Sequence, residues 1–429
     1  MPSRGKARPV GSTFAALSER GFGRYLSGQF SSSAGTWMQR VAQDWLVLDL
    51  TDGSGVAVAV TTSLQFLPYL ASPWSGVLAD RISRRTILMC SQAVGLLISL
   101  GMGVAVATSH AMVLLVYVAA LVSGMAAALD GPARLAIIGD IVPSAHLVNG
   151  VGLNAMAFNL ARIVGPALAG LLIAFTGMMF VFAAIAGLFL LALIVFASLP
   201  RTRPQVGIQD RATFRQGIHL LRASPEIAVA LAFVFVVSSF GLYFHLTTAL
   251  ISREVFGGGA ATFGIMSTLI AVGAMTGALT IGRRPTVNLA TVSIAALVFG
   301  IVEITAGLMP TLATYGAMLI LCGAGALVFS TAAQSFVQLR SPSDVRGRMM
   351  GIYTLVFYAG HPVGAPIVGW VSDRLGPRFT LIGAGLCVLA GTAIVTVIWI
   401  SLGRDRIRGL GPRTGINGSV DRNRRRWEP

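Results

Sequence analysis

The chain has 429 residues, of which 55% are hydrophobic and only 11% are charged, and its mean hydropathy is +0.76. Soluble globular proteins carry about 25% charged residues, so this composition excludes a soluble protein of two or three domains. The net charge of +16 does not indicate nucleic-acid binding, because the basic residues cluster in short segments between long apolar runs, a distribution typical of membrane proteins.

Apolar runs of about 20 residues, the length that crosses a bilayer as an α-helix, recur along the whole chain. They predict an all-α membrane protein with twelve transmembrane helices. The predicted spans are residues 25–48, 56–79, 86–107, 111–131, 149–175, 178–199, 226–250, 261–282, 289–309, 312–338, 349–371 and 378–402.

The positions of Lys and Arg predict the orientation of these spans. With the N-terminus inside the cell, 27 of the 32 basic residues fall in cytoplasmic segments and 3 in external loops. Cytoplasmic loops of membrane proteins carry such an excess, so we expect a multi-pass protein of the cell (inner) membrane with both termini in the cytoplasm. The cytoplasmic basic segments would lie beside the anionic lipids of the inner leaflet.

A sequence pattern repeats at an offset of about 199 residues: Pro143, Gly152, Gly165, Gly170 and Gly177 recur as Pro342, Gly351, Gly364, Gly369 and Gly376. Six spans separate the copies, which predicts two parallel-repeat six-helix halves with the same orientation. The expected parts are a cytoplasmic N-terminal tail (1–24), a first half (25–199), a cytoplasmic linker (200–225), a second half (226–402) and a basic cytoplasmic C-terminal tail (403–429).

The linker carries a helical pattern. Phe214, Ile218 and Leu221 share one face of such a helix, with arginines elsewhere. This favours an amphipathic helix on the inner membrane surface over the alternative of a plain basic linker.

The first span contains a stripe of polar residues at helical spacing: Gln29, Ser33, Thr36, Arg40, Gln43 and Asp44. An unsatisfied polar group in lipid costs several kcal/mol, so such a stripe must face a protein interior or a water-filled cavity. Arg40 and Asp44 lie one turn apart, from just past the middle of the membrane into its outer half. The stripe therefore predicts the wall of a cavity.

Other polar residues lie within predicted spans: Asp130, Arg162, His245, Glu303, Gln334 and His361. We assign Arg162, His245 and Gln334 to the same cavity, although a lone intramembrane histidine more often has a hydrogen-bonded packing role. Glu303 lies in a span that otherwise resembles a lipid-facing helix, so no role is assigned to it. The aromatic residues Trp37, Trp45, Phe66 and Phe158 are candidates to contact a hydrophobic molecule.

The second span ends in the sequence GVLADRISRR, residues 76–85. Gly76, Asp80, Arg81, Arg84 and Arg85 match the signature G-x3-D-R-x-G-R-R of the major facilitator superfamily, with Ser83 in place of the second glycine. The resemblance implies a cytoplasmic gate in which the acid meets the positive N-terminal end of the helix that starts near residue 349. Alternatively, the arginines only anchor the end of the span at the inner surface.

Two further residues are implied in this gate by the resemblance. Asp130 and Arg134 lie at the inner end of the fourth span, where the family places an acid and a base. We expect Asp130 to pair with Arg84 or Arg85.

Residues of the fifth span resemble one group within this superfamily, the antiporters. Gly165, Pro166 and Gly170 are similar to the antiporter signature G-x3-G-P-x2-G-G, with alanine at two of its glycine positions. Residues 37–55, 129–143 and 153–172 also resemble the bacterial drug and siderophore exporters, the group that includes the enterobactin exporter. Small residues at these positions permit close helix packing.

The resemblance implies a secondary active exporter: a proton-coupled antiporter of a small amphipathic molecule such as a drug or siderophore, working by alternating access as a monomer. By location, Asp44 is the leading candidate to bind the coupling proton. If Arg40 never leaves it, the two residues instead form a structural salt bridge. Two other functions remain open, a proton-coupled importer of a small nutrient and a lipid flippase without proton coupling.

An enzyme is not expected, because the sequence lacks a metal-binding cluster, a nucleophile elbow and a phosphate-binding loop. The three cysteines lie within apolar runs and show no CxxC spacing. No cofactor, metal or nucleic-acid partner is therefore expected.

Overall fold

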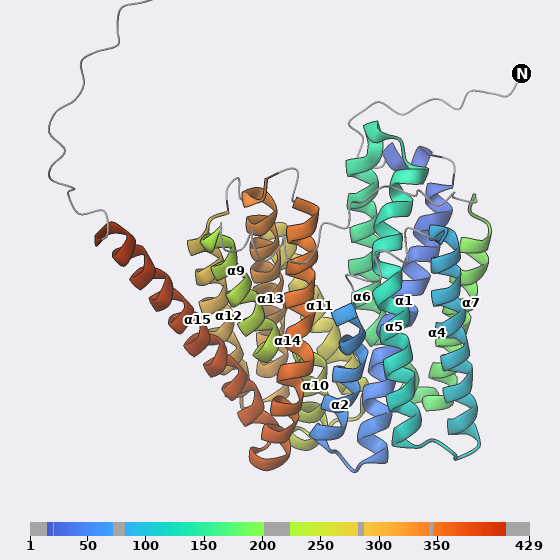
Figure 1. Cartoon of the computed structure of the whole chain (residues 1–429). Helices are drawn as coiled ribbons and strands as arrows, with labels where there is room; N and C mark the ends of the chain where they lie inside the picture. Colours follow the sequence, from blue (N-terminus) through green and yellow to red (C-terminus); the bar gives the residue numbers. More distant parts are fainter. Residues whose placement is uncertain are drawn as a thin grey trace, which may run out of the picture.

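The computed structural model describes residues 15–19, 21–71, 82–200, 224–281, 287–342 and 346–408. Within these ranges the regular structure is helical, without a strand. Figure 1 shows two groups of helices side by side, α1 to α7 and α9 to α15. The residues of the predicted linker helix, together with Gly76, Asp80 and Arg81 of the predicted gate, lie outside the described residues.

Among the described residues, the first group contains the α-helices α1 (Phe22–Leu50), α2 (Gly55–Phe66), α4 (Arg84–Ala107), α5 (Val113–Ile141), α6 (Leu147–Thr176) and α7 (Met178–Ala197). Helix α2 continues into the 3-10 turn η2 (Leu67–Ala71). The second contains α9 (Pro225–Phe240), α10 (Phe244–Leu250), the π-helical turn η4 (Ile251–Val255), α11 (Ala260–Ile281), α12 (Leu289–Gly307), α13 (Leu312–Arg340), α14 (Arg346–Leu375) and α15 (Pro377–Arg408).

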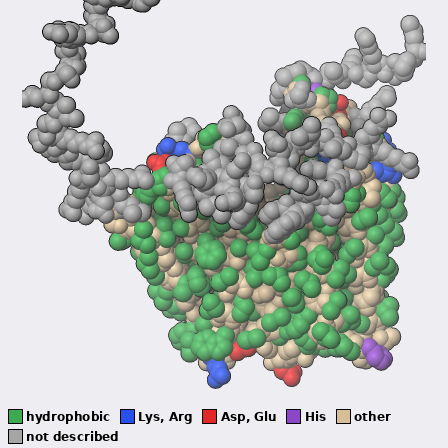
Figure 2. Space-filling model, viewed as in Figure 1, with side chains coloured by type: hydrophobic (Ala, Val, Ile, Leu, Met, Phe, Trp, Pro, Cys, Tyr) green, Lys and Arg blue, Asp and Glu red, His purple; other side chains and the backbone are tan. Residues whose placement is uncertain are grey.

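Among the described residues, 8 helices are long and apolar enough to cross a membrane, namely α4, α5, α6, α7, α11, α12, α13 and α15. The other predicted spans coincide with α1, α2, α9 and α14, which are shorter or carry more polar residues. Several helices extend beyond the predicted spans, since hydropathy marks only the part of a helix that lies in lipid. Figure 2 shows a broad band of hydrophobic side chains, with charged side chains towards its two ends.

The seventh predicted span is not one continuous helix. Gly241–Tyr243 separate α9 from α10. The hydroxyl of Tyr243 donates to the backbone carbonyls of Gly360 and His361 in α14, at 3.2 and 2.8 Å. The break between α9 and α10 is thus stabilised by hydrogen bonds to α14, a helix distant in the chain. The apolar content of the span does not predict this break.

The bundle has two distinct ends. We call the end where α1 begins and α15 ends the terminal end, and the end where α1 passes into α2 the opposite end (Figure 1). The two groups of helices pack tightly where α6 meets α11. A Cβ atom on Gly170 would lie 2.6 Å from the carbonyl oxygen of Ala260 and 2.6 Å from the Cα of Gly264. Only glycine allows this approach.

Charged residues also join the two groups at the opposite end. Asp373 in α14 accepts hydrogen bonds from the backbone N–H groups of Gly55 and Val56, at 2.5 and 3.2 Å, and from the hydroxyl of Ser54 at 3.2 Å. A carboxylate here is favoured by the positive N-terminal end of α2.

An ion pair lies close to this cap. Arg253 in η4 contacts Asp49 at the end of α1 at 2.9 Å. The neighbouring Glu254 lies at the surface of this cluster, where partial desolvation raises the pKa of its carboxyl group. Nearby Asp373 raises this pKa further, and Arg253 lowers it. Together with the Asp373 cap, the ion pair ties the first group of helices to the second at this end.

Candidate transport cavity

A cavity of about 470 Å³ lies between the two groups of helices. Its wall is formed by α1, α2, η2, α5 and α6 from the first group and by residues of α10, α11, α13 and α14 from the second. Pro166 of the predicted antiporter motif lies in this wall, and Gly170, one turn further along α6, packs against α11. The cavity is therefore bounded towards the opposite end by the contact between α6 and α11.

Most of the residues predicted to face a cavity lie in this wall: Gln29, Ser33, Thr36, Arg40, Asp44 and Arg162. Asp130, Arg134 and His361 line it as well. The polar stripe of the first span thus forms one wall of a real cavity, as its spacing indicates.

Two of the predicted lining residues lie elsewhere. Gln43 is 1% exposed and lines a separate space of about 60 Å³ within the first group of helices. There its amide oxygen accepts a hydrogen bond from Gln65 at 3.0 Å. Gln43 and Asp44 are neighbours in the chain, so they point about 100° apart on a helix. Gln334 is exposed and absent from the wall. The side chain of His245 lies outside the described residues.

Arg40 and Asp44 do not form an ion pair. The Arg40 guanidinium lies over two rings, with its Cζ atom 4.9 Å from the centroid of Trp37 and 5.0 Å from that of Phe66. Asp44 is 2% exposed, and its Oδ1 atom has no hydrogen-bond partner among the described residues. The structural salt bridge that the sequence left open is therefore not formed here.

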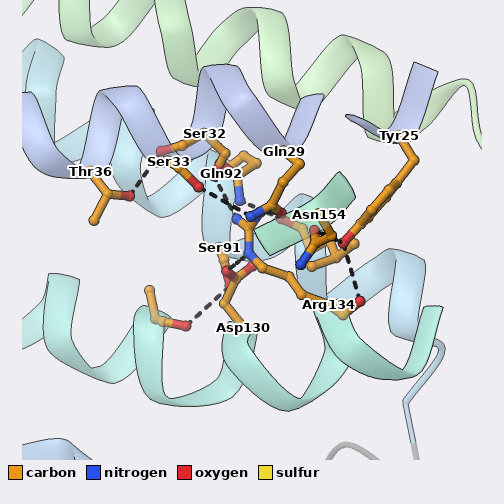
Figure 3. Close-up of polar contacts among 12 residues, drawn as sticks. Tyr25, Gln29, Ser32, Ser33, Thr36, Ser91, Gln92, Asp130, Arg134 and Asn154 are labelled. Atoms are coloured by element: carbon orange, nitrogen blue, oxygen red, sulfur yellow. Dashed lines mark hydrogen bonds and ion pairs between the residues drawn. The ribbon is translucent and has the colours of Figure 1, made fainter. Parts of the chain in front are cut away.

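Arg134 is the centre of a polar network in the first group of helices (Figure 3). From α5 it forms an ion pair with Asp130 and donates to the side-chain oxygen of Gln29 and to the hydroxyl of Ser32, the latter at 2.6 Å. Nearby, the hydroxyl of Tyr25 donates to Asn154 at 3.0 Å. The network links α1, α5 and α6 beside the cavity.

The predicted pairing of Asp130 with Arg84 or Arg85 is wrong. Asp130 is occupied by Arg134, one turn away on the same helix. Arg84 instead forms an ion pair with Asp140, and Arg85 donates to the carbonyl of Ala197 at the end of α7. Asp140 lies about 15 Å further along α5 than Asp130, which puts it at the level where α4 begins.

Ser83, which stands in place of a glycine of the gate signature, caps the start of α4. It has φ of −60° and ψ of 134°, and its hydroxyl accepts a hydrogen bond from the backbone N–H of Thr86 at 3.2 Å. Serine is a favoured residue at the N-cap of a helix. The position therefore starts α4 without needing the conformational freedom of glycine.

Aromatic side chains from both groups of helices meet at the cavity wall. The ring of Tyr358 in α14 stacks on Tyr69 of η2, with centroids 4.1 Å apart, and on Phe66 at 5.8 Å. The ring centroids of His361 and Phe66 lie 4.2 Å apart, and the Nδ1 atom of His361 is 3.2 Å from the carbonyl oxygen of Phe357. The contacts of His361 are those of a packed, hydrogen-bonded side chain.

Tyr69 and Tyr358 are cavity residues that the sequence pattern does not indicate, and one of the predicted aromatic candidates lies elsewhere. Trp37, Phe66 and Phe158 line the cavity. Trp45 does not: it is 7% exposed and stacks on Phe263 of α11, with centroids 6.0 Å apart. Spacing within a single span could not reveal a cluster that forms only where η2 meets α14.

The glycines of the predicted antiporter motif lie at two different helix contacts. A Cβ atom on Gly165 would lie 2.9 Å from the Cβ of Trp37 in α1. Gly170 faces α11 on another side of α6. Pro166, between them, borders the cavity. The motif therefore sets the distance of α6 from one helix in each group.

The amino-acid sequence is similar to those of a multidrug efflux pump and of an enterobactin exporter. It is 27% identical over 421 residues to the multidrug efflux pump Tap of Mycobacterium tuberculosis, covering 91% of this chain and 95% of that protein. It is 24% identical over 354 residues to the enterobactin exporter EntS of Salmonella typhimurium, covering 80% of this chain and 83% of that protein.

The fold is also similar to that of a solved transporter. The crystal structure of the nucleoside transporter NupG superposes with a TM-score of 0.70, covering 89% of this chain and 99% of that protein at 12% identity. The predicted all-α membrane fold of the major facilitator type is thus confirmed. Residues 11–405 match the family of transmembrane secretion effectors. The chain therefore belongs to this family of major facilitator membrane transporters.

Proposed function

We propose that the protein is a secondary active exporter in the cell membrane, with both termini in the cytoplasm, which exchanges protons for a small amphipathic molecule such as a drug or siderophore. The observation that carries the proposal is the polar-lined cavity of about 470 Å³ between the two groups of helices. The similarity to efflux proteins favours export over import.

The position of the contacts between the groups supports an alternating-access cycle. The tight contacts of Gly170 with α11, of Asp373 with the start of α2 and of Arg253 with Asp49 all lie towards the opposite end. In a rocking mechanism, these contacts would form in one state and separate in the other. With the termini in the cytoplasm, the state seen here has its external side closed.

Asp44 is the side chain that we propose as the proton carrier. It borders the cavity, it is buried, and one of its carboxylate oxygens has no partner among the described residues. An ionised carboxylate in that position lacks the hydrogen bonds that offset its burial, and binding a proton removes that cost. Asp130 is a weaker candidate, because Arg134 already neutralises it.

The test is proton-driven efflux in inverted membrane vesicles that contain the Asp44→Asn variant. We expect the variant to lose uphill transport driven by a proton gradient while keeping downhill exchange of substrate. Asp52→Asn is the matched control: Asp52 lies in the exposed turn after α1, outside the cavity wall, and its φ of 50° suits asparagine. Undiminished proton-coupled efflux by Asp44→Asn would rule out the role of Asp44.

The same vesicles distinguish the other functions. Proton-driven accumulation of a nutrient on the cytoplasmic side would identify an importer. Movement of a labelled lipid between leaflets, unaffected by a protonophore, would identify a flippase. Either result would replace the proposed function.

A further inference from the structure

Two arginine side chains contact the ring of Trp37 in the cavity wall. The Cζ atom of Arg40 lies 4.9 Å from the ring centroid of Trp37, and the Cζ atom of Arg162 lies 5.5 Å from it. Arg40 comes from α1 and Arg162 from α6. The tertiary structure thus brings two guanidinium groups to one indole ring, and both border the cavity.

Among the described residues, neither of these arginines forms an ion pair, although Arg40 interacts electrostatically with Asp44 one turn away. Arg134, Arg84 and Arg253 each form an ion pair with an aspartate. The contacts of Arg40 and Arg162 within the described part of the chain are cation–π contacts with aromatic rings. A charge at membrane depth is costly unless it is paired or hydrated, and two like charges near each other raise the cost further. The pair therefore forms a site in which an anion would be stabilised.

The formal charge of the cavity wall supports this reading. Its described titratable groups include three arginines and two aspartates. One arginine, Arg134, is neutralised by Asp130. What remains is Arg40, Arg162 and Asp44, an excess of positive charge on the side of the cavity formed by α1 and α6.

Flat aromatic side chains lie next to the arginines. Phe66 lies under the Arg40 guanidinium and also stacks with Tyr358 at a centroid distance of 5.8 Å. Tyr69 stacks with Tyr358 at 4.1 Å. Phe158 meets the edge of Trp37 at 6.2 Å. An aromatic ring bound beside these rings would gain stacking contacts that a flexible acyl chain would not make.

We propose that the cavity selects aromatic organic anions, binding the anionic group between Arg40 and Arg162 and the aromatic body against Phe66, Tyr69 and Tyr358. The proposal rests on the proposed function, because it assigns the class of molecule that this exporter carries. A guanidinium suits this role, since its planar fork can donate two parallel hydrogen bonds to a carboxylate or sulfonate.

The test is an equilibrium binding titration of the purified full-length protein in phosphatidylcholine nanodiscs, measured by isothermal titration calorimetry. The probes are naphthoate, the neutral naphthamide and the cationic naphthylmethylammonium, which share one ring system. We expect naphthoate to bind roughly ten- to hundredfold more tightly than naphthamide, because charge-assisted hydrogen bonds are stronger than neutral ones. The cationic probe should bind most weakly.

Variants then locate the site. Arg40→Gln and Arg162→Gln should each weaken naphthoate binding roughly tenfold or more and leave naphthamide binding unchanged. Arg340→Gln is the control, because it removes an exposed arginine that pairs with Glu226 outside the cavity wall. If a Gln variant fails to fold, Arg40→Lys and Arg162→Lys keep the charge but lose the planar fork, and should still weaken naphthoate binding selectively.

Three outcomes would overturn the inference: equal binding of the three probes, binding of none of them, or naphthoate binding that is unaffected by both arginine variants. Repeating the titration in phosphatidylglycerol nanodiscs separates a soluble anion from a lipid headgroup, since displacement of naphthoate by the anionic lipid would assign the arginines to lipid instead. Binding needs no proton gradient, so failure of the Asp44 coupling test and failure of this one are distinguishable.

Discussion

Arg40 and Asp44 lie one helical turn apart on α1, yet their side chains form no ion pair. The guanidinium lies over the rings of Trp37 and Phe66, while Asp44 is buried and its Oδ1 atom has no hydrogen-bond partner in the described part of the chain. We therefore expect Asp44→Asn to leave the thermal unfolding midpoint of the purified protein unchanged or raised, because no ion pair is lost and a buried charge is removed. A structural salt bridge would instead cost about 3–5 kcal/mol when broken, which calorimetry in one detergent would detect.

Arg134 provides the contrasting case. Replacing it with methionine leaves Asp130 charged and unpaired and removes the contacts to Gln29 and Ser32. We expect Arg134→Met to destabilise the protein by about 3–5 kcal/mol, and the double variant with Asp130→Leu to recover part of this loss. Equal unfolding midpoints for Arg134→Met and the parent protein would contradict the structural role of the network.

The cap on α2 by Asp373 should control how often the opposite end opens. Asp373→Ala removes three accepted hydrogen bonds, and loss of a helix cap costs about 1 kcal/mol. We expect a larger population in which this end is open, measured as the distance between spin labels at the exposed residues Met112 and Leu308, in the loops after α4 and α12. Asp373→Asn keeps an acceptor and should have a smaller effect. Identical distance distributions for all three proteins would contradict the cap.

The contact of α6 with α11 should be sensitive to one methyl group. Gly170→Ala places a Cβ atom 2.6 Å from backbone atoms of α11, and such overpacking costs about 1–3 kcal/mol. We expect the variant to separate the helices and to lower transport. Gly152→Ala is the control on the same helix, since its Cβ would meet nothing within 4 Å. If both variants transport equally well, the close approach is not needed.

The charge cluster at the opposite end should respond to pH through Glu254. Its pKa is raised by burial and by Asp373, against the effect of Arg253. Because the raised pKa belongs to the closed state, protonation of Glu254 stabilises that state, and this contribution is lost as pH rises through the raised pKa. The spin-label distance between Met112 and Leu308 should therefore shift towards the closed state as the pH falls through the raised pKa of Glu254, which lies above the ordinary glutamate value of about 4.3. Glu254→Gln should flatten the response, and an unchanged response would contradict it.

The sequence alone established the fold class and one wall of the site, because both depend on local patterns. Long apolar runs require helices in lipid, where the backbone must satisfy its own hydrogen bonds. The polar stripe from Gln29 to Asp44 follows the helical period, so its direction was readable from one span. The prediction is wrong for Gln43, because its side chain points about 100° away from that of Asp44 around the helix and borders a different space.

The ion pairs of the charged side chains depend on the tertiary structure, and so does the absence of an ion pair at Arg40 and Arg162 among the described residues. Asp130 and Arg84 both had partners that the gate signature did not indicate, because helix length and level determine which side chains can reach each other. Arg40 and Arg162 both contact the ring of Trp37 because α6 approaches α1 closely at Gly165. Sequence spacing reports the faces of single helices, whereas the chemistry of this cavity arises between helices that are far apart in the chain.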